Sequence, residues 1–584
     1  MVLYTFARAA ACFALFLSWQ ADAMPSKDPV PSLSDISITE LQKLLGNGAV
    51  TSRDLVDLYA SRIAEVNDEL HAVIEVDTDS ALAAADMLDR ERLNGNVRGP
   101  LHGIPILVKD NYATTSSSLK TGAGSVCLAS GSRPKQEATV ITKLRAAGAI
   151  VLGKTNQAEF SGARGLRVPA GWSARGGQTY GAYVRNQTAC GSSSGSGVAA
   201  GLGLAAAALG TETAGSVTCP AAFGNAVGVK PTVGLTSRAG IVPITGRQDS
   251  VGVLARNVAD AAVVLERMAG RDGRDNYTEA QPWEDGPPRY SEALEAEALR
   301  GRRIGVMWHE GVIPGFGRNY WVNKEQIRRL FDEALEILRG AGAVLVDLPV
   351  DGYDGKGPLD IPMRDASDYI YPDFKEGLAR YYDNLVPDED ESGDTNAIIR
   401  NHTQLLECLR TEPRERSAEY SLEAIAAIAE ENEPLLPASS AEAWTAYVNV
   451  SEATGSLIRT PLREHHLDGL VMYMDLAIGL ASRPGMPIVT VPMGGLGNDA
   501  QVVYSDEADW DGDAGDELLP RLVVGAPGMP QGLSFVGEKW TEMELIGFAY
   551  AYEQASRKRG ALRPWVEIKR DLKDRMGSHG IGEL

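Results

Sequence analysis

The sequence is poor in histidine and cysteine, the common ligands of transition-metal ions. Its 584 residues include 7 histidines and 5 cysteines, and neither a C-x-x-C nor an H-E-x-x-H motif occurs. His465 and His466 form a close pair, but adjacent residues do not share a face of a helix or strand. A zinc site or another transition-metal site is therefore not expected.

Positive charge is also scarce. Lysine and arginine number 56 against 78 acidic residues, which gives a formal net charge of -22. Phosphate groups are bound by basic patches, so neither nucleic acid nor an anionic membrane is an expected partner. A G-x-x-x-x-G-K-[ST] sequence is absent, which excludes a P-loop. Beyond the first residues, no apolar run has the length of a transmembrane helix, so no transmembrane segment is expected.

The N-terminus has the pattern of a secretory signal peptide. Arg8 supplies a positive charge, residues 9–19 are uncharged and mostly apolar, and residues 21–23 match the small-x-small cleavage pattern. The apolar run is too short to cross a bilayer. An interfacial anchor or a buried N-terminal helix is the alternative interpretation. We expect a signal peptide at residues 1–23 and a secreted mature protein at residues 24–584.

Glycosylation sequons and cysteines are consistent with secretion. Four N-x-S/T sequons occur, at Asn186, Asn276, Asn401 and Asn449. Removal of the signal peptide would leave four cysteines, Cys127, Cys190, Cys219 and Cys408. An even number permits disulfide bonds in a secreted protein, but the sequence leaves open whether they form.

Helical patterns alternate with short apolar runs in the N-terminal third. Apolar residues at helical spacing predict a helix over residues 52–65, and residues 138–147 predict another that ends before Gly148. The apolar runs at residues 104–108 and 150–152 predict buried strands. This alternation indicates an α/β layered fold.

The remaining composition favours one large domain. Residues 282–298 are polar and predict a surface connection, while the acidic stretches 387–395 and 505–517 predict solvated loops. No repeat of 20 to 50 residues is evident. No stretch resembles a long interdomain linker.

Three segments contain groups suited to acyl transfer. Lys109 ends an apolar run, where burial would lower its pKa and make it a base; a surface lysine is the alternative. Ser192 and Ser216 each lie in a turn rich in glycine, within residues 190–197 and 210–220. Such turns can present backbone N–H groups to an oxyanion, although each alone could be a flexible loop.

Together, and in this order, the three segments resemble the amidase signature family. The family patterns G-I-P-x-x-x-K, G-S-S-x-G-S and G-T-x-x-x-G-S match residues 103–109, 191–196 and 210–216. Ser216 follows Ser192 by 24 residues, which is the family's usual spacing. Further similar segments lie at residues 228–232, 237–244, 256–262, 528–533 and 550–554, so that the resemblance covers roughly residues 39–555.

The resemblance implies roles for individual residues. Lys109 falls on the general base, Ser216 on the nucleophile, and Ser192 on a proton-relaying serine that the family holds through a cis peptide bond. The oxyanion hole is expected from the backbone N–H groups of Thr213, Ala214, Gly215 and Ser216. No metal and no organic cofactor are implied.

The resemblance also implies a fold and an activity. We expect a single large α/β domain with a mixed, mostly parallel sheet flanked by helices. The implied reaction is hydrolysis of a linear carboxylic amide, on a small molecule or peptide, through a seryl acyl-enzyme. Residues 301–466 are expected to supply the more variable parts of the substrate pocket.

Several motif positions depart from the commonest family pattern. They are Cys190 in place of glycine, Glu212 in place of aspartate, Ala214 in place of glycine or aspartate, and Thr218 in place of arginine. Glu212 and Cys219 resemble a subgroup that contains bacterial peptide amidase and its plant and fungal relatives. These departures leave the amide substrate open.

Other interpretations remain to be tested. Residues 191–195 match the G-x-S-x-G nucleophile elbow, which would make Ser193 the nucleophile, but no buried strand precedes them. His102 is expected to be structural rather than a catalytic base. An ester hydrolase, an acyl transferase and a non-catalytic binding protein on the same scaffold are the alternative functions. A glutamyl-amidotransferase subunit is disfavoured by the signal peptide.

Overall fold

The structure is a computed structural model, and it describes part of the chain. The expected signal peptide lies outside the described residues, as does most of each acidic stretch. The described residues are 31–116, 118–165, 168–308, 322–348, 363–388, 398–430, 435–505 and 521–576.

A large sheet of 11 strands forms the centre of the described structure. Its order from edge to edge is β1 (Val73–Val76), β4 (Ala149–Thr155), β2 (Ile104–Lys109), β7 (Ala207–Glu212), β9 (Ser250–Ala255), β8 (Val227–Lys230), β14 (Ile488–Gly495), β17 (Pro530–Val536), β13 (Gly469–Tyr473), β10 (Arg303–Met307) and β11 (Val344–Asp347). Three small two-stranded sheets pair β12 (Leu385–Pro387) with β3 (Ser132–Pro134), β15 (Val503–Tyr504) with β16 (Val523–Gly525), and β5 (Trp172–Ser173) with β6 (Gly177–Gln178).

The central sheet is mixed, as expected. Parallel pairs are confined to two groups, β4–β2–β7 and β13–β10–β11. Between these groups, from β7 to β13, neighbouring strands are antiparallel. The predicted α/β fold with a mixed sheet flanked by helices is therefore confirmed. Among the described strands, its four parallel pairs lie in these two groups, so that the six antiparallel pairs outnumber them and the sheet is mixed rather than mostly parallel.

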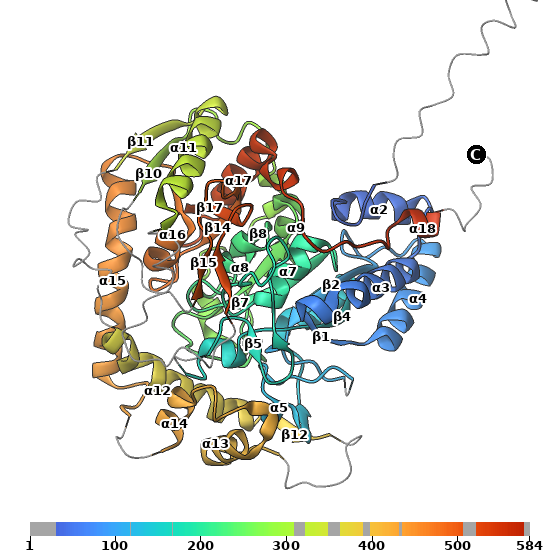
Figure 1. Ribbon diagram of the computed structural model, residues 1–584, viewed down its shortest axis with the longest axis vertical. Coiled ribbons are helices and arrows are strands. Elements are labelled where there is room, and N and C mark those ends of the chain that lie inside the picture. Colours follow the sequence, from blue (N-terminus) through green and yellow to red (C-terminus); the bar gives the residue numbers. More distant parts are fainter. Residues whose placement is uncertain are drawn as a thin grey trace, which may run out of the picture.

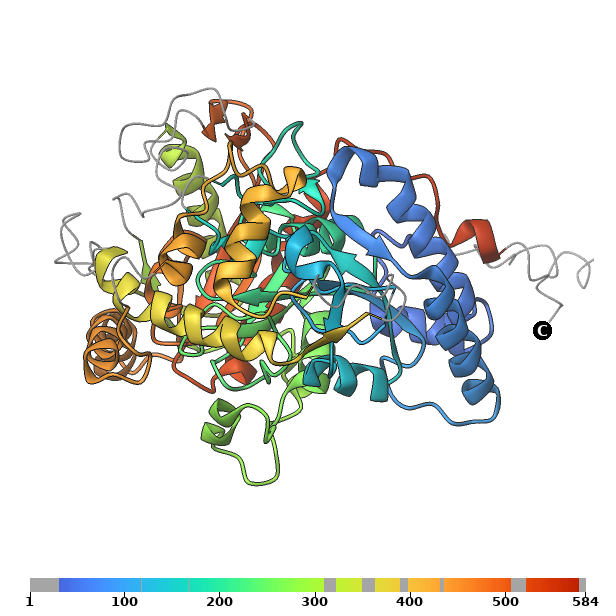
Figure 2. The same cartoon turned by 90° about the horizontal axis from the view of Figure 1, so that it is seen from below.

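Helices surround this sheet (Figure 1). In both views, α2 to α4 lie together with α18 at one end of the molecule, and α15 lies at the opposite end (Figure 2). The helices are α2 (Ile38–Gly46), α3 (Ser52–Leu70), α4 (Thr78–Leu93), α5 (Val126–Ala129), α6 (Thr139–Ala146), α7 (Ser194–Leu202), α8 (Thr218–Phe223), α9 (Val258–Met268), α11 (Lys324–Gly340), α12 (Met363–Tyr382), α13 (His402–Thr411), α14 (Glu423–Ala429), α15 (Ala441–Glu464), α16 (Met474–Ala481), α17 (Glu542–Ser556) and α18 (Lys573–Met576). Short 3-10 helices are η1 (Glu159–Gly162), η2 (Asn276–Ala280), η3 (Tyr290–Ala293), η5 (Pro413–Glu415) and η7 (Lys558–Ala561).

The elements predicted from periodicity are present, with small changes at their ends. Helix α3 begins at Ser52, where Thr51 and Asp54 form a capping box, and it continues to Leu70 rather than residue 65. The predicted strands are β2 and β4, and the predicted second helix is α6. Gly148 follows that helix with a φ of 90°, a conformation that favours glycine.

Small residues allow α7 and α8 to pack closely beside the sheet. Both helices are buried along their whole length. A Cβ atom at Gly197 would lie 2.4 Å from the carbonyl oxygen of Pro220, and one at Gly201 would lie 2.0 Å from that of Gly224. Glycine is therefore required at both positions. This close contact brings together the two turns that precede the helices.

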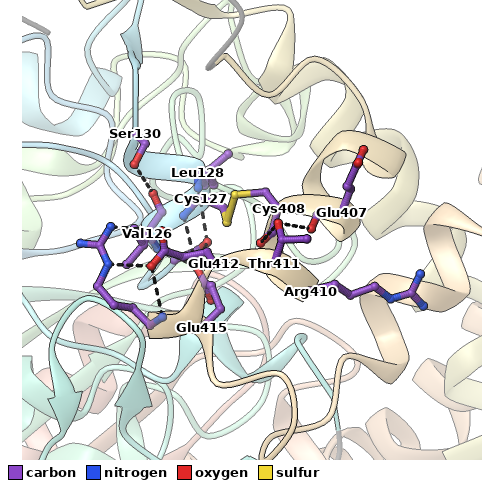
Figure 3. The surroundings of a disulfide bond; sticks show 12 residues. Val126, Cys127, Leu128, Ser130, Glu407, Cys408, Arg410, Thr411, Glu412 and Glu415 are labelled. Atoms are coloured by element: carbon purple, nitrogen blue, oxygen red, sulfur yellow. Dashed lines mark hydrogen bonds and ion pairs between the residues drawn. A yellow bond between two sulfur atoms is a disulfide. The ribbon is translucent and has the colours of Figure 1, made fainter.

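All four cysteines of the expected mature chain form disulfide bonds. Cys190 pairs with Cys219, and Cys127 pairs with Cys408. The second bond joins α5 to α13 across 281 residues of sequence (Figure 3). Beside it, Glu415 accepts hydrogen bonds from the backbone N–H groups of Val126 and Cys127.

The surface agrees with one further expectation. Residues 282–298 form an irregular, largely solvent-accessible connection that contains η3. Each sequon asparagine has an exposed side chain. Within the described parts of the chain, no helix combines the length and apolar character that a membrane span requires.

Candidate active site

The candidate base lies at the end of a strand in the parallel group. Lys109 is the last residue of β2, and Thr211 lies near the end of the neighbouring parallel strand β7. Parallel strands end at the same edge of a sheet, which places the two side chains together. The Nζ atom of Lys109 lies 2.7 Å from Ser192 Oγ and 2.9 Å from Thr211 Oγ1. Lys109 therefore contacts one of the two predicted catalytic serines directly.

Burial changes the protonation of Lys109. The side chain has no solvent exposure, and removal from water holds the pKa of Lys109 well below its usual range. The negative charges of Asp249 and Glu212 oppose this shift without cancelling it. The neutral amine is thereby favoured, and a neutral amine can accept a proton from a hydroxyl group.

The two serines are in contact through the backbone. The N–H group of Ser192 donates to Ser216 Oγ over 3.2 Å, and Ser193 N–H donates to the carbonyl oxygen of Ser216 over 3.1 Å. Among the described residues, no hydrogen bond joins the Ser192 and Ser216 hydroxyl groups. Catalytic hydrogen bonds often shorten only when substrate binds. Ser216 is largely buried, with 8% of the residue exposed.

The expected cis peptide bond is not found. No peptide bond in the described part of the chain is cis. The backbone turns instead at Cys190 and Gly191, which both adopt left-handed conformations with φ of 57° and 51°. These two residues redirect the chain into α7 without a cis bond, so this detail of the prediction is wrong for this structure.

The turn before Ser216 is organised by Glu212. This buried carboxylate accepts hydrogen bonds from the backbone N–H groups of Gly215, Val217 and Thr218 at 2.7–2.9 Å. The N–H group of Gly215 is therefore occupied, which corrects its expected role in the oxyanion hole. Within the described residues, the N–H groups of Thr213, Ala214 and Ser216 donate to no other group, so three of the four predicted donors remain available.

A second set of contacts holds the start of this turn. Thr213 Oγ1 donates to Asp249 over 2.6 Å, and Gln248 Nε2 donates to the carbonyl oxygen of Thr213 over 3.3 Å. The hydroxyl of Tyr369, from α12, donates to Gln248 Oε1 over 2.5 Å. Residues from three separate segments thus fix the backbone that faces the oxyanion position.

The alternative catalytic residues have other roles. Ser193 Oγ donates to the carbonyl of Thr211 over 3.2 Å and is completely buried. It lies at the start of α7, and no strand leads into it, which argues against a nucleophile elbow. His102 contacts the Leu88 carbonyl with one ring nitrogen and the Arg98 N–H with the other, which fits its expected structural role.

Sequence analysis missed several parts of the site. Thr211 and Asn111 extend the Lys109 contacts, since Asn111 Nδ2 donates to Thr211 Oγ1 over 3.0 Å. Lys154 and Lys230 are also buried, and burial lowers the pKa of each to about 8. Their Nζ atoms donate to backbone carbonyl groups, and neither is hydrogen-bonded to a serine in the described structure. Burial alone does not distinguish Lys109 from these two lysines, whereas its contact with Ser192 does.

The fold and the site together are compatible with an amide hydrolase built on a mixed α/β sheet. The chain belongs to the amidase family, whose pattern matches residues 54–546.

Individual relatives agree with this assignment. A protein of the fungus Arthroderma benhamiae that is named as an amidase is 38% identical over 573 residues, covering 94% of this chain and 90% of the relative. A plant protein named as an amidase, from Arabidopsis thaliana, is 32% identical over 90% of this chain and 91% of its own length. Peptide amidase from Stenotrophomonas maltophilia, whose crystal structure is known, is 33% identical in sequence to this chain. The structural alignment covers 93% of this chain and 99% of the peptide amidase chain, with a TM-score of 0.75.

Proposed function

We propose that this protein is a secreted serine amidase that hydrolyses linear carboxylic amides through an acyl-enzyme on Ser216. The observation that carries the proposal is the 2.7 Å contact between the buried Lys109 and Ser192, whose N–H group in turn contacts Ser216 Oγ. Depression of the pKa of Lys109 by burial supports its role as base.

The proposed acylation begins with two proton transfers. Neutral Lys109 accepts a proton from Ser192, and Ser192 accepts one from Ser216 as the Ser216 oxygen attacks the amide carbonyl. The Ser192 hydroxyl must turn toward Ser216 for this transfer. Negative charge develops on the carbonyl oxygen, where the N–H groups of Thr213, Ala214 and Ser216 can stabilise it.

The proposed cycle is completed by returning these protons. The tetrahedral intermediate collapses as Ser192 donates a proton to the leaving nitrogen, which departs as a neutral amine. Water then attacks the acyl group, with the same groups removing its proton and returning one to Ser216. The products are a carboxylic acid and an amine. Apart from substrate and water, every group in this reaction sequence is a side chain or backbone group of the chain.

The amide substrate is proposed by analogy with a relative. The Stenotrophomonas protein named peptide amidase is similar over nearly its whole length, which favours peptide or amino-acid amides as substrates here. An ester hydrolase or acyl transferase would use the same site. The direct test is a panel of peptide C-terminal amides, fatty amides and aryl amides, with matched esters and an added amine acceptor. Release of free acid from a peptide amide is expected; turnover of esters alone would contradict the proposal.

Secretion is a separate part of the proposal. It is supported by the N-terminal pattern, by the two disulfide bonds and by the exposed positions of Asn186, Asn276, Asn401 and Asn449. Disulfide bonds persist in oxidising compartments, and glycans require a surface acceptor.

A further inference from the structure

Asp475 is a buried carboxylate to which no group in the described part of the chain donates a hydrogen bond. It lies in the first turn of α16 and is 3% exposed. Its Oδ1 atom is buried without a hydrogen bond, and no described group donates to either carboxylate oxygen. Buried polar groups in proteins are nearly always hydrogen-bonded, and a buried carboxylate without a partner is costly.

The position of Asp475 connects it to the candidate active site. Ile478 and Ser482 follow it by three and seven residues, so the three lie on one face of the helix. Ile478 packs against the nucleophile turn, where a Cβ atom at Gly215 would lie 3.2 Å from its Cδ1. Ser482 Oγ donates to Glu212 over 3.4 Å. The face that carries Asp475 is therefore the face that meets the turn before Ser216.

The separation along this face is short. With a rise of about 1.5 Å per residue, Asp475 lies about 5 Å along the helix axis from Ile478. About one helical turn therefore separates Asp475 from the residue that contacts the turn before Ser216. A position in the first turn of a helix stabilises a charged carboxylate. The Asp475 oxygens nevertheless accept no hydrogen bond from a helical N–H group in the described structure.

The electrostatics of Asp475 fit a cationic partner. Burial raises the pKa of Asp475 to about 7, and no neighbouring charge contributes to that shift. A bound cation stabilises the ionised form of such a carboxylate and supplies the hydrogen-bond donors that it lacks. By contrast, buried Asp260 on α9 already accepts from the Ile38 N–H over 2.8 Å and from Asn257 over 2.9 Å.

We propose that Asp475 binds a protonated primary amine of the substrate, close to the scissile carbonyl. The inference rests on the proposed function, and it assigns the substrate class as amides of amino acids with a free amino group. In a primary carboxamide the leaving group is ammonia, so this amine belongs to the acyl part. Asp475 is thus a specificity residue that contacts the substrate away from the bond that breaks.

The test compares two ligands that differ by one amine. Leucinamide and 4-methylpentanamide share a carbon skeleton, and only the first carries the ammonium group. Their dissociation constants are measured by calorimetry on the Ser216→Ala variant, which cannot turn them over, and on the Ser216→Ala/Asp475→Asn variant. We expect the Ser216→Ala variant to prefer leucinamide by about 10- to 100-fold, the range of a hydrogen bond to a charged group. The second variant should lose that preference.

Control variants separate binding from folding. Asp260→Asn, combined with Ser216→Ala, neutralises a buried carboxylate that already has partners, and the preference for leucinamide should persist. The melting temperature of Asp475→Asn should be equal to or above that of the wild type, because no hydrogen bond is lost. Equal binding of both ligands by Ser216→Ala, or a preference that survives Asp475→Asn, would overturn the inference.

Failure of this inference is distinguishable from failure of the proposed function. Hydrolysis of both amides by the wild type, with no preference in binding, would contradict the role of Asp475 alone. A binding preference that depends on Asp475, without hydrolysis of either amide, would support the subsite and contradict the amidase mechanism.

Discussion

Cys190 is joined to Cys219 by a disulfide bond that connects the turn carrying Ser192 to the turn carrying Ser216. The turns are also in direct contact, since a Cβ atom at Gly191 would lie 2.6 Å from Pro220 Cδ. The relative placement of the two serines therefore depends on a covalent link as well as on packing.

Removal of this disulfide should impair both activity and stability. For the Cys190→Ser/Cys219→Ser variant we expect kcat on a peptide amide to fall by about 10- to 100-fold, because small displacements of reacting groups are costly. The free energy of unfolding should decrease by about 2–4 kcal/mol. Steady-state kinetics and denaturant unfolding measure the two effects.

The second disulfide supplies the matched control. Cys127→Ser/Cys408→Ser removes a bond between α5 and α13, neither of which contains a candidate catalytic residue. It should lose stability while keeping kcat within about threefold of the wild type. Equal losses of kcat in both variants would show that the Cys190–Cys219 bond has no special role in the site.

Lys109→Ala should affect amides more than activated esters. An amine must be protonated before it leaves, whereas a phenoxide leaves with less help, and the lysine relay supplies that proton. We expect kcat/KM for the amide to fall by about 10²- to 10⁴-fold, with a smaller loss for an aryl ester of the same acyl group. Equal losses on both substrates would exclude a role of Lys109 in leaving-group protonation.

The same residue determines the expected pH dependence. Burial lowers the pKa of Lys109, and the neutral amine is the active form. The kcat/KM of the wild type should therefore be highest above this lowered pKa and fall as the pH decreases through it. A pH profile measured on a substrate without titratable groups tests this sign. A rate that rises with acidity over the same range would contradict a neutral lysine base.

The sequence located the candidate catalytic residues better than it predicted their surroundings. Lys109, Ser192 and Ser216 could be located because their short motifs recur in order, and the structure brings Lys109 to Ser192 and Ser192 to Ser216. Local patterns also predicted α3 and β2, since amphipathic spacing and buried strands depend on nearby residues.

Contacts between distant segments could not be predicted in this way. The Cys127–Cys408 pairing spans 281 residues, and one of several possible pairings had to be selected by the fold. The hydrogen bond from the Gly215 N–H group to Glu212 depends on the conformation of the Glu212 side chain, which the spacing of residues in the sequence does not determine. The lack of a hydrogen bond to Asp475 Oδ1 among the described residues is likewise a property of the three-dimensional packing, which local sequence patterns do not reveal.

Glu212→Gln should disturb the nucleophile turn. An amide group presents an N–H₂ donor where the carboxylate accepts three backbone N–H groups, so at least one of these groups loses its partner. We expect kcat to fall at least tenfold and the free energy of unfolding to fall by about 1–3 kcal/mol. Glu212→Asp keeps two acceptor oxygens and should recover part of both losses. Wild-type kcat in Glu212→Gln would show that this carboxylate does not organise the site.

Secretion and glycosylation can be tested on protein from a eukaryotic host. We expect a mature N-terminus at Met24, protein in the medium, and a decrease in apparent mass after glycosidase treatment. Asn→Gln substitution at each of the four exposed sequons identifies those in use. An intact, unglycosylated chain that stays inside the cell would contradict this part of the proposal.

The central claim is that Ser216 is the nucleophile, and covalent labelling tests it most directly. The protein is treated with a fluorophosphonate, digested, and mapped by mass spectrometry, with Ser216→Ala and Ser193→Ala as comparison variants. The account predicts one adduct, on Ser216, which is absent in Ser216→Ala and retained in Ser193→Ala. An adduct on Ser193, or labelling that persists in Ser216→Ala, would contradict it.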